Sequence, residues 1–202
     1  MRSITLLTFL IFSHATNNGG FFLPIQVTDR HEVGHIELTV IGQFGLLRKA
    51  RPGIPAHLHT GIDFKRPTNN YDDEPIFPIA QGTVISKRDD GPYAQLIIEH
   101  EGDEPFWTVY EHIAGIAVAL FEPVTPDQPI ARFMNLQELD RYGWQFDHFH
   151  FEVLKAPPIQ LKVDGVQNPE RLFASHTLTC YTEADLAEKF YDPMVFLKER
   201  LK

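Results

Sequence analysis

The chain contains little cysteine, little basic charge and no long apolar run. Cys180 is the only cysteine, so no disulfide can form within the 202 residues. Lys and Arg number 18 against 27 Asp and Glu, and an acidic surface of this kind disfavours binding to nucleic acid or to anionic lipid. The apolar stretch near the N-terminus is too short to cross a bilayer as a helix. We therefore expect neither a nucleic-acid partner nor a membrane span in the mature protein.

Repeats and low-complexity linkers are absent as well. Apolar residues make up 43% of the chain, which suffices for one buried core and predicts a single domain. The first segment, residues 1–15, has the pattern of a signal peptide: Arg2, an apolar stretch, and the small residues Ser13 and Ala15 at the positions that a signal peptidase reads. A buried N-terminal strand is the alternative. We expect an exported protein, located in the periplasm or otherwise secreted. After the signal peptide, we expect residues 16–40 to form an extension or an edge strand.

Strand patterns dominate the rest of the chain. Apolar residues alternate with polar or small ones over residues 36–40, and strands are also expected over residues 80–86, 95–100, 107–112 and 148–154. Helix signals are confined to the end, where Thr182 with Asp185 resembles a capping box and Asp192-Pro193 opens a last segment. These patterns predict a mainly β fold, an antiparallel sheet closed by short C-terminal helices.

A zinc-protease motif is present but lacks its structural context. His31-Glu32-Val33-Gly34-His35 matches HExxH, which binds zinc only on a helix, where both histidines share a face. Gly34 and the period-two pattern that follows predict a strand instead. Histidines four apart on a straight strand are separated by about 13 Å. We expect no metal site here.

Two other histidines have a better context. His148 and His150 alternate with Phe149 and Phe151, so a strand places both imidazoles on one face and both phenyl rings in the core. Upstream, His59 and Asp63 are separated by a glycine that can bend the chain. Two His and one carboxylate, with water as fourth ligand, suit a hydrolytic zinc. Copper, nickel or ferrous iron would also accept these ligand types, and His57 competes with His59 for the same role.

The remaining histidines are expected to have different roles. His148 lies about 6.6 Å from His150 along a strand, so it lines the same cavity without binding the ion. With His112 it forms a pair that could take a proton from water and stabilise a tetrahedral intermediate. His100, at the end of an apolar strand, is expected to be a structural residue.

The chain resembles a known family in several ordered blocks. Residues 44–45, 57–64 (HLHTGIDF), 78–84, 110–113 and 148–153 (HFHFEV) resemble the blocks of the lysostaphin-like, or LytM-type, zinc metallopeptidases. The resemblance implies a compact antiparallel β domain over residues 41–155 with a substrate groove. Residues 156–202 lie outside the resemblance, and we expect them to form a C-terminal extension packed on the same domain.

The resemblance also implies a chemistry. It implies one zinc ion per chain held by His59, Asp63 and His150, catalytic histidines at His112 and His148, and endopeptidase action on the peptides of bacterial peptidoglycan through zinc-bound water. In a periplasm the D-alanyl to diaminopimelate bond is the expected target, with glycine bridges or a protein substrate as alternatives. A non-catalytic relative that binds wall material or regulates another hydrolase is the second hypothesis, although all five positions are filled. A metal-binding oxygenase or isomerase of the cupin kind is a third.

One stretch departs from the family pattern. Relatives carry a glycine-rich segment before the HxH strand, whereas residues 132–147 contain only Gly143 and several large apolar side chains. This stretch could form a short helix and an aromatic flap beside the groove. We favour the alternative, a small hydrophobic cluster under a long loop.

Overall fold

Strands form most of the regular structure of this protein. The structure is a computed structural model that describes residues 20–102, 104–162 and 168–201; the signal peptide predicted for residues 1–15 lies outside them. The strands are β1 (Leu47–Arg48), β2 (His57–Leu58), β3 (Ile62–Lys65), β4 (Pro75–Ile76), β5 (Gly82–Arg88), β6 (Gln95–His100), β7 (Phe106–Glu111), β8 (Pro123–Val124), β9 (Ala131–Arg132), β10 (His148–Leu154), β11 (Ile159–Gln160), β12 (Phe173–Ala174) and β13 (Phe190–Tyr191).

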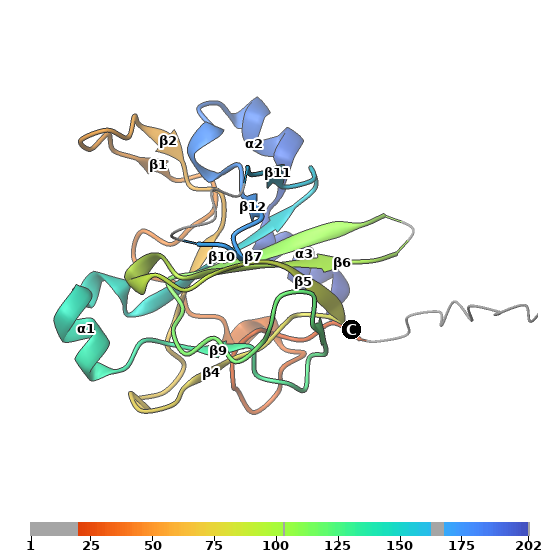
Figure 1. Ribbon diagram of the computed structural model, residues 1–202. Coiled ribbons are helices and arrows are strands. Elements are labelled where there is room, and N and C mark those ends of the chain that lie inside the picture. The colour runs from red at the N-terminus through yellow and green to blue at the C-terminus, as the bar shows by residue number, and fades with distance from the viewer. Residues whose placement is uncertain (1–19, 103, 163–167, 202) are drawn as a thin grey trace, which may run out of the picture.

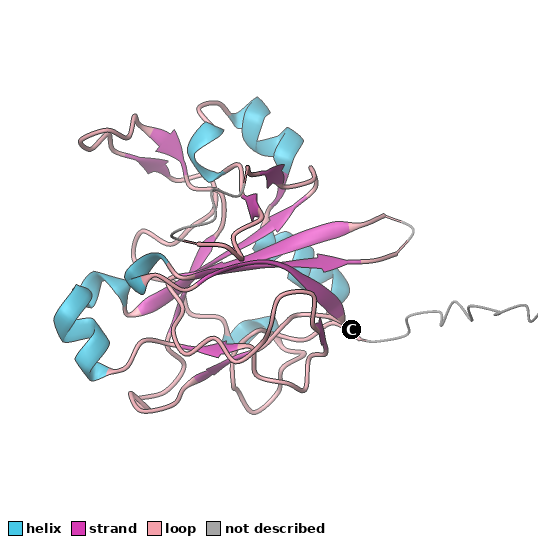
Figure 2. Cartoon of the chain, in the orientation of Figure 1, coloured by secondary structure: helices cyan, strands magenta, loops and turns pink. Residues whose placement is uncertain are grey.

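The helices are few and short (Figure 2). The α-helices are α1 (Leu136–Tyr142), α2 (Glu183–Lys189) and α3 (Pro193–Arg200), and the 3-10 helices are η1 (Val33–His35), η2 (Gly91–Tyr93), η3 (Trp144–Phe146) and η4 (Thr177–Thr179). Among the described residues, no helix has the length and apolar character needed to span a membrane.

A seven-stranded antiparallel sheet organises the chain. Its order is β13-β10-β7-β6-β5-β8, with β3 beside β10. Strands β5, β6, β7 and β10 are the long ones. They overlap four of the five strands expected from the sequence, and β6 and β10 have the expected bounds. The mainly β antiparallel fold predicted above is confirmed.

Alternation along the strands gives the sheet two different faces. Phe149, Phe151 and Val153 of β10 belong to the large core, together with Tyr110 of β7, while Leu154 belongs to a second cluster on the other face. This follows from the period of two, because successive side chains of a strand point to opposite faces. His148 and His150 therefore share the face of the second cluster.

The C-terminal region covers part of that second face. In Figure 1, α2, β11 and β12 lie above the sheet beside the β1–β2 hairpin, whereas β4 and β9 lie below it. Cys180, Leu186 and Phe190 pack with sheet residues that include Ile97 and Val109. Cys180 thus serves as a small buried apolar residue, as expected for a lone cysteine.

Capping explains where the C-terminal helices begin. Thr182 and Asp185 form the predicted capping box of α2, each side chain accepting from the other residue's backbone N–H. Asp192 accepts from the backbone N–H groups of Met194 and Val195 and so caps α3, which has Pro193 in its first turn.

Two expectations about secondary structure were wrong. Helices are not confined to the end, because α1 forms in the 132–147 stretch, where Asn135 and Glu138 make a second capping box. Leu139 of α1 packs with Met134 and Ala114 in the small hydrophobic cluster that we expected in this stretch. Helix and cluster therefore coexist.

Residues 36–40 do not form the predicted strand either. Leu38 makes a single bridge to Phe64 of β3, and the Gly42 N–H then donates to the Thr39 carbonyl, which turns the chain away. Val40 is left 93% exposed. Because this segment pairs with β3 at only one bridge, the chain turns here and does not continue as a strand.

Candidate metal centre

Strand pairing brings two of the proposed ligands together. In the register between β10 and β3, His150 lies directly opposite Asp63. His59 precedes β3 and is joined to it through Gly61. A Cβ atom on Gly61 would lie 2.2 Å from the Phe151 carbonyl oxygen, so only glycine allows the chain to pass this close to β10.

Three ligand atoms converge at this point. His59 Nε2 lies 2.9 Å from His150 Nδ1 and 3.1 Å from Asp63 Oδ1, and His150 Nδ1 lies 3.0 Å from the same oxygen. All three side chains are buried, and together they form the one His/Cys/Asp/Glu group found in the described part of the chain that could hold a metal ion. Zinc bonds of about 2.0–2.1 Å in a tetrahedral site place ligand atoms about 3.3 Å apart. The donor set therefore fits zinc and needs only a small expansion.

Each of these side chains is also held at its outer atom. His59 Nδ1 donates to the Gln43 carbonyl at 2.8 Å. Arg48 Nη2 donates to Asp63 Oδ2 at 2.8 Å, and His150 Nε2 donates to Glu152 Oε1 at 3.0 Å. Metal-binding histidines usually donate their second N–H to a carbonyl or carboxylate, which fixes the ring and its tautomer.

Hydrogen bonds control the protonation of this cluster. Burial alone would raise the pKa of Asp63, but hydrogen bonds from His150 and His59 hold it well below its usual range. Burial alone would lower the pKa of His150, but its hydrogen bonds to Asp63 and Glu152 raise that pKa to about 10. To act as a metal ligand, His150 would have to release the proton on Nδ1.

Two further histidines lie next to the cluster. His148 Nε2 is 3.9 Å from Asp63 Oδ1, and the ring centres of His112 and His148 are 5.3 Å apart. His112 follows β7 with a positive φ of 64°, a conformation that persists only where the surroundings enforce it. Its Nδ1 donates to the Pro92 carbonyl at 2.6 Å. Burial lowers the pKa of both His112 and His148 to about 4, so both rings are neutral at pH 7.

Other histidines lie outside this group. His57 Nδ1 donates to the Pro55 carbonyl at 2.9 Å. His31 and His35 are exposed, and η1 begins only after Glu32, which caps it. His100 is buried between the Gln81 carbonyl and the Thr108 hydroxyl. The structure thus brings together His59, Asp63, His112, His148 and His150.

Sequence reasoning missed the residues that hold the outer atoms. Glu152 could have been found, because it lies two positions after His150 and a strand puts both on one face. Arg48 lies on β1, and Gln43 contributes its backbone. No local pattern marks either residue, since tertiary folding alone brings them to His59 and Asp63.

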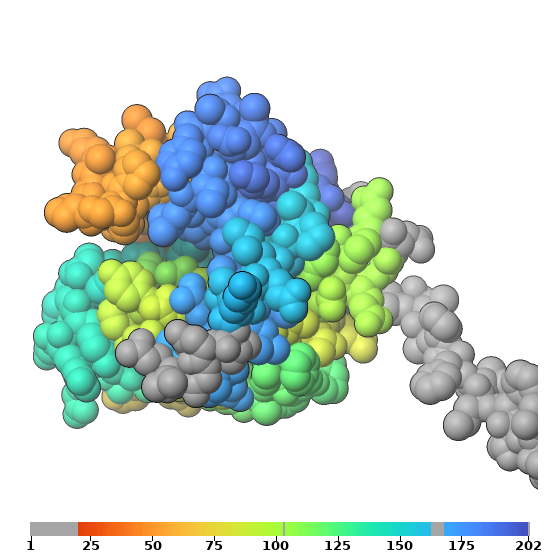
Figure 3. All heavy atoms as spheres, turned by 45° about the horizontal axis from the view of Figure 1, so that its top comes forward, coloured from red at the N-terminus to blue at the C-terminus, as the bar shows by residue number. Residues whose placement is uncertain are grey.

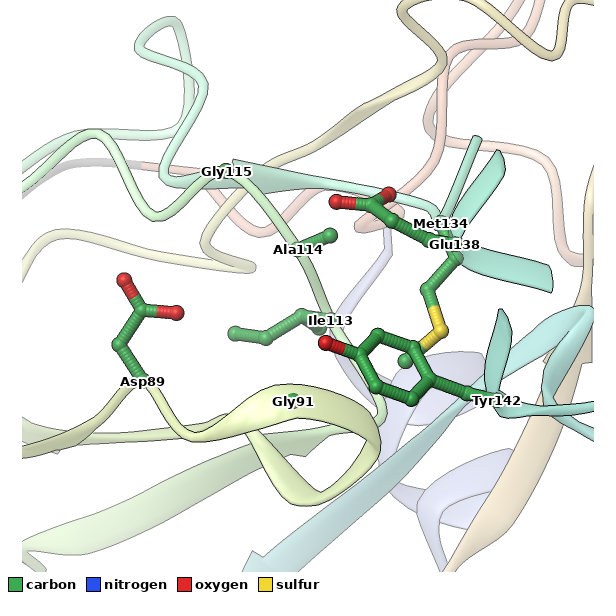
Figure 4. A pocket seen from close by; sticks show the side chains of 8 residues that line it. All are labelled: Asp89, Gly91, Ile113, Ala114, Gly115, Met134, Glu138 and Tyr142. Atoms are coloured by element: carbon green, nitrogen blue, oxygen red, sulfur yellow. The ribbon is translucent and has the colours of Figure 1, made fainter. Parts of the chain in front are cut away.

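The surface of the molecule has hollows. In Figure 3, the orange residues of the β1–β2 hairpin and the teal residues of α1 stand on two sides of a recess. A separate pocket of about 220 Å³ adjoins the His112 loop and is shown in Figure 4. Its lining consists of Asp89, Gly91, Ile113, Ala114, Gly115, Met134, Glu138 and Tyr142. None of these residues is a proposed ligand, so this pocket is distinct from the metal cluster.

Solved structures with similar folds were found by comparison. A zinc-containing peptidase from Vibrio cholerae is 27% identical, with a TM-score of 0.44, over 67% of this chain and 37% of its own. A structure titled cbpa from L. salivarius REN is 12% identical, with a TM-score of 0.54, over 90% of this chain and 97% of its own. LytU is 22% identical, with a TM-score of 0.42, over 59% of this chain and 73% of its own.

The likeness to cbpa supports the fold alone. The chain spans 37% of the length of the Vibrio cholerae peptidase. A comparison with curated proteins found no match.

A family comparison is more specific. Residues 57–164 match peptidase family M23, which is more than half of the 202 residues. The matched segment contains His59, Asp63, His112, His148 and His150. The resemblance to LytM-type peptidases is thereby confirmed, and the protein belongs to peptidase family M23.

Proposed function

We propose that this chain is an exported zinc metalloendopeptidase that hydrolyses the peptide cross-links of bacterial peptidoglycan. One observation carries the proposal: three buried ligand atoms of His59, Asp63 and His150 lie within 3.1 Å of one another and are fixed from behind, next to two neutral histidines. Membership of a peptidase family supports the same chemistry.

The roles of the ligands follow from their contacts. His59 Nε2, Asp63 Oδ1 and His150 Nδ1 would hold the ion. A bound zinc supplies an activated water and polarises the carbonyl under attack. Gln43, Arg48 and Glu152 keep the three side chains oriented. Three protein ligands leave one position for water or substrate, as in catalytic rather than structural zinc sites.

His112 is suited to take up a proton. Its Nδ1 donates to the Pro92 carbonyl, so in the neutral ring Nε2 has the free lone pair and is the accepting atom. Burial keeps the ring neutral at pH 7 by lowering its pKa to about 4. We assign His112 as the general base and later the acid toward the leaving amine.

His148 is suited to stabilise charge. Its ring is neutral and lies between His112 and Asp63. A neutral imidazole still offers one N–H donor. Donation to the negative oxygen that develops during attack on a peptide bond is the role we assign to it.

The substrate is assigned from the family chemistry. Export places the protein where peptidoglycan is found, and an acidic chain of net charge −9 is not expected to bind nucleic acid. Within peptidoglycan we propose the D-alanyl to diaminopimelate bond as the scissile bond. Cleavage of glycine bridges or of a protein would correct that choice without changing the reaction class.

The proposal is tested on the purified mature protein. Zinc is measured by elemental analysis, and purified peptidoglycan is digested with native, chelator-treated and zinc-reloaded protein. We expect one zinc per chain, and cross-linked muropeptides cleaved to new peptide ends that mass spectrometry identifies. Chelation should abolish cleavage and zinc should restore it. Zinc without cleavage would favour a non-catalytic wall-binding or regulatory protein, and absence of zinc would refute the ligand assignment.

A further inference from the structure

A buried carboxylate lies directly behind the proposed metal site. Glu152 of β10 has no exposed surface, and none of its partners among the described residues is Lys or Arg. Such a group is costly to bury unless its oxygens are satisfied.

Four donors satisfy this carboxylate. His150 Nε2 donates to Oε1 at 3.0 Å, Thr60 Oγ1 at 2.5 Å and Thr177 Oγ1 at 2.8 Å. Ser175 Oγ donates to Oε2. Three donors thus reach Oε1 and one reaches Oε2, and these contacts fix the position of Glu152 and of the imidazole bound to it.

Two of these donors come from outside the family match. The match ends at residue 164, whereas Ser175 directly follows β12 and Thr177 is the first residue of η4. The C-terminal extension therefore does more than cover apolar surface, because it reaches the layer of side chains that holds a metal ligand.

The segment that carries these hydroxyls is anchored on both sides. Before it, the Phe173 N–H and carbonyl both bond to Ser86 Oγ of β5 at 3.1 Å. After it, the Leu58 N–H donates to the Cys180 carbonyl at 2.8 Å, and Cys180 is buried in the second cluster. Both hydroxyls are thus held against the sheet rather than on a free loop.

We propose that Ser175 and Thr177 are positioning residues of the metal site, which fix His150 for metal binding through Glu152. The inference rests on the proposed function, because it requires a metal at His59, Asp63 and His150. It assigns the C-terminal extension a part in metal affinity. The hydrogen bond to Glu152 favours the tautomer of His150 that has its proton on Nε2, which leaves the lone pair of Nδ1 free for the ion.

The test compares full-length variants by their affinity for zinc. Ser175→Ala/Thr177→Ala removes both hydroxyls, and Ser175→Thr/Thr177→Ser retains them. Thr179→Ala is the matched control, since its hydroxyl donates to the His176 carbonyl in the same segment without touching Glu152. Zinc affinity is measured by competition with a chelator, and ¹⁵N NMR reports which ring nitrogen of His150 is protonated in the zinc-loaded protein. Thermal unfolding of the metal-free proteins checks that each is folded.

The double alanine variant should bind zinc about 10–100-fold more weakly, while the hydroxyl-exchanged variant and Thr179→Ala remain close to the native affinity. In the native protein the His150 Nε2 signal should be that of a protonated nitrogen. A folded double alanine variant with native zinc affinity would overturn the inference and leave the proposed function intact. A native protein that binds no zinc would overturn both.

Discussion

Two pairs of histidines in this chain have a spacing that could suit a metal ion, but their surroundings differ. His31 and His35 lie on a short exposed segment where Glu32 caps a 3-10 turn. His148 and His150 lie on a central strand, next to β3 and β7. The first pair matches a well-known motif by its letters. The second pair has neighbours that converge on it.

The difference lies in what holds the side chains. His31 is bonded to the exposed Asp29, whereas each member of the buried cluster is fixed at its outer atom by Gln43, Arg48 or Glu152. A metal site needs side chains held in place before the ion arrives. Sequence spacing is therefore enough to suggest metal ligands, but whether they can bind an ion depends on the residues that hold their outer atoms.

The largest expected effect comes from breaking the buried pair. His150→Ala removes one of three ligand atoms and should lower zinc affinity by more than about a hundredfold, beyond the loss from an outer contact. The double variant His31→Ala/His35→Ala should retain zinc. Elemental analysis after gel filtration measures both, and loss of zinc from the double variant would assign the metal to the exposed motif.

The next effect concerns His112 and His148, the histidines beside the proposed metal site. His112→Asn, a residue that tolerates positive φ, and His148→Gln should each slow cleavage by about 10²–10⁴-fold. Zinc content should stay at the native value. Steady-state hydrolysis of a cross-linked muropeptide measures the rate, and unchanged rates in both variants would remove these residues from the mechanism.

The glycines of the two histidine motifs, Gly61 and Gly34, are packed differently. Gly61→Ala would place a Cβ 2.2 Å from the Phe151 carbonyl oxygen, whereas Gly34→Ala would meet only the flexible end of Glu32 at 3.3 Å. We expect Gly61→Ala to destabilise the fold by about 3 kcal/mol or more and Gly34→Ala by less than about 0.5 kcal/mol. Urea denaturation compares the two, and equal midpoints would contradict the packing argument.

His100, on the face of the sheet opposite to the metal cluster, should give a pH-dependent effect on stability. Burial lowers the pKa of His100 to about 4, against about 6.5 in an unfolded chain. Between these values the unfolded state binds more protons, so stability is fully present above pH 6.5 and falls as the pH drops toward 4. The loss should reach roughly 3 kcal/mol.

The matched variant is His100→Gln, which keeps a polar group beside Gln81 and Thr108 and has no proton to gain. Its urea midpoint should change less between pH 7 and pH 4.5 than that of the native protein. An identical pH dependence in both proteins would show that His100 is not the responsible group.

Strand periodicity predicted the centre of the fold well. The strands over residues 95–100 and 148–154 coincide with β6 and β10, because β6 has an apolar run over residues 96–98 and β10 has an apolar face. Helix α2 followed from its capping box. Residues 36–40 failed, since alternation alone does not show whether a partner edge continues. A short helix in the stretch that holds α1 was considered but not favoured, even though Asn135 and Glu138 form the same kind of cap as in α2.

The candidate site divides in the same way. The sequence alone determined which residue types and spacings were available, namely His148 and His150 on one face of a strand and His59 with Asp63 around a glycine. Those are local properties, because side-chain direction in a strand depends only on its period.

Tertiary structure decided everything that joins distant segments. It placed Asp63 opposite His150, brought Arg48 from the β1–β2 hairpin to Asp63, and carried Ser175 and Thr177 from the C-terminal extension to Glu152. No local pattern specifies such contacts, since they depend on which strands pair and on how the extension packs against the sheet. The proposed ligands could thus be picked out from the sequence, whereas the side chains that orient them are brought together only in the folded protein.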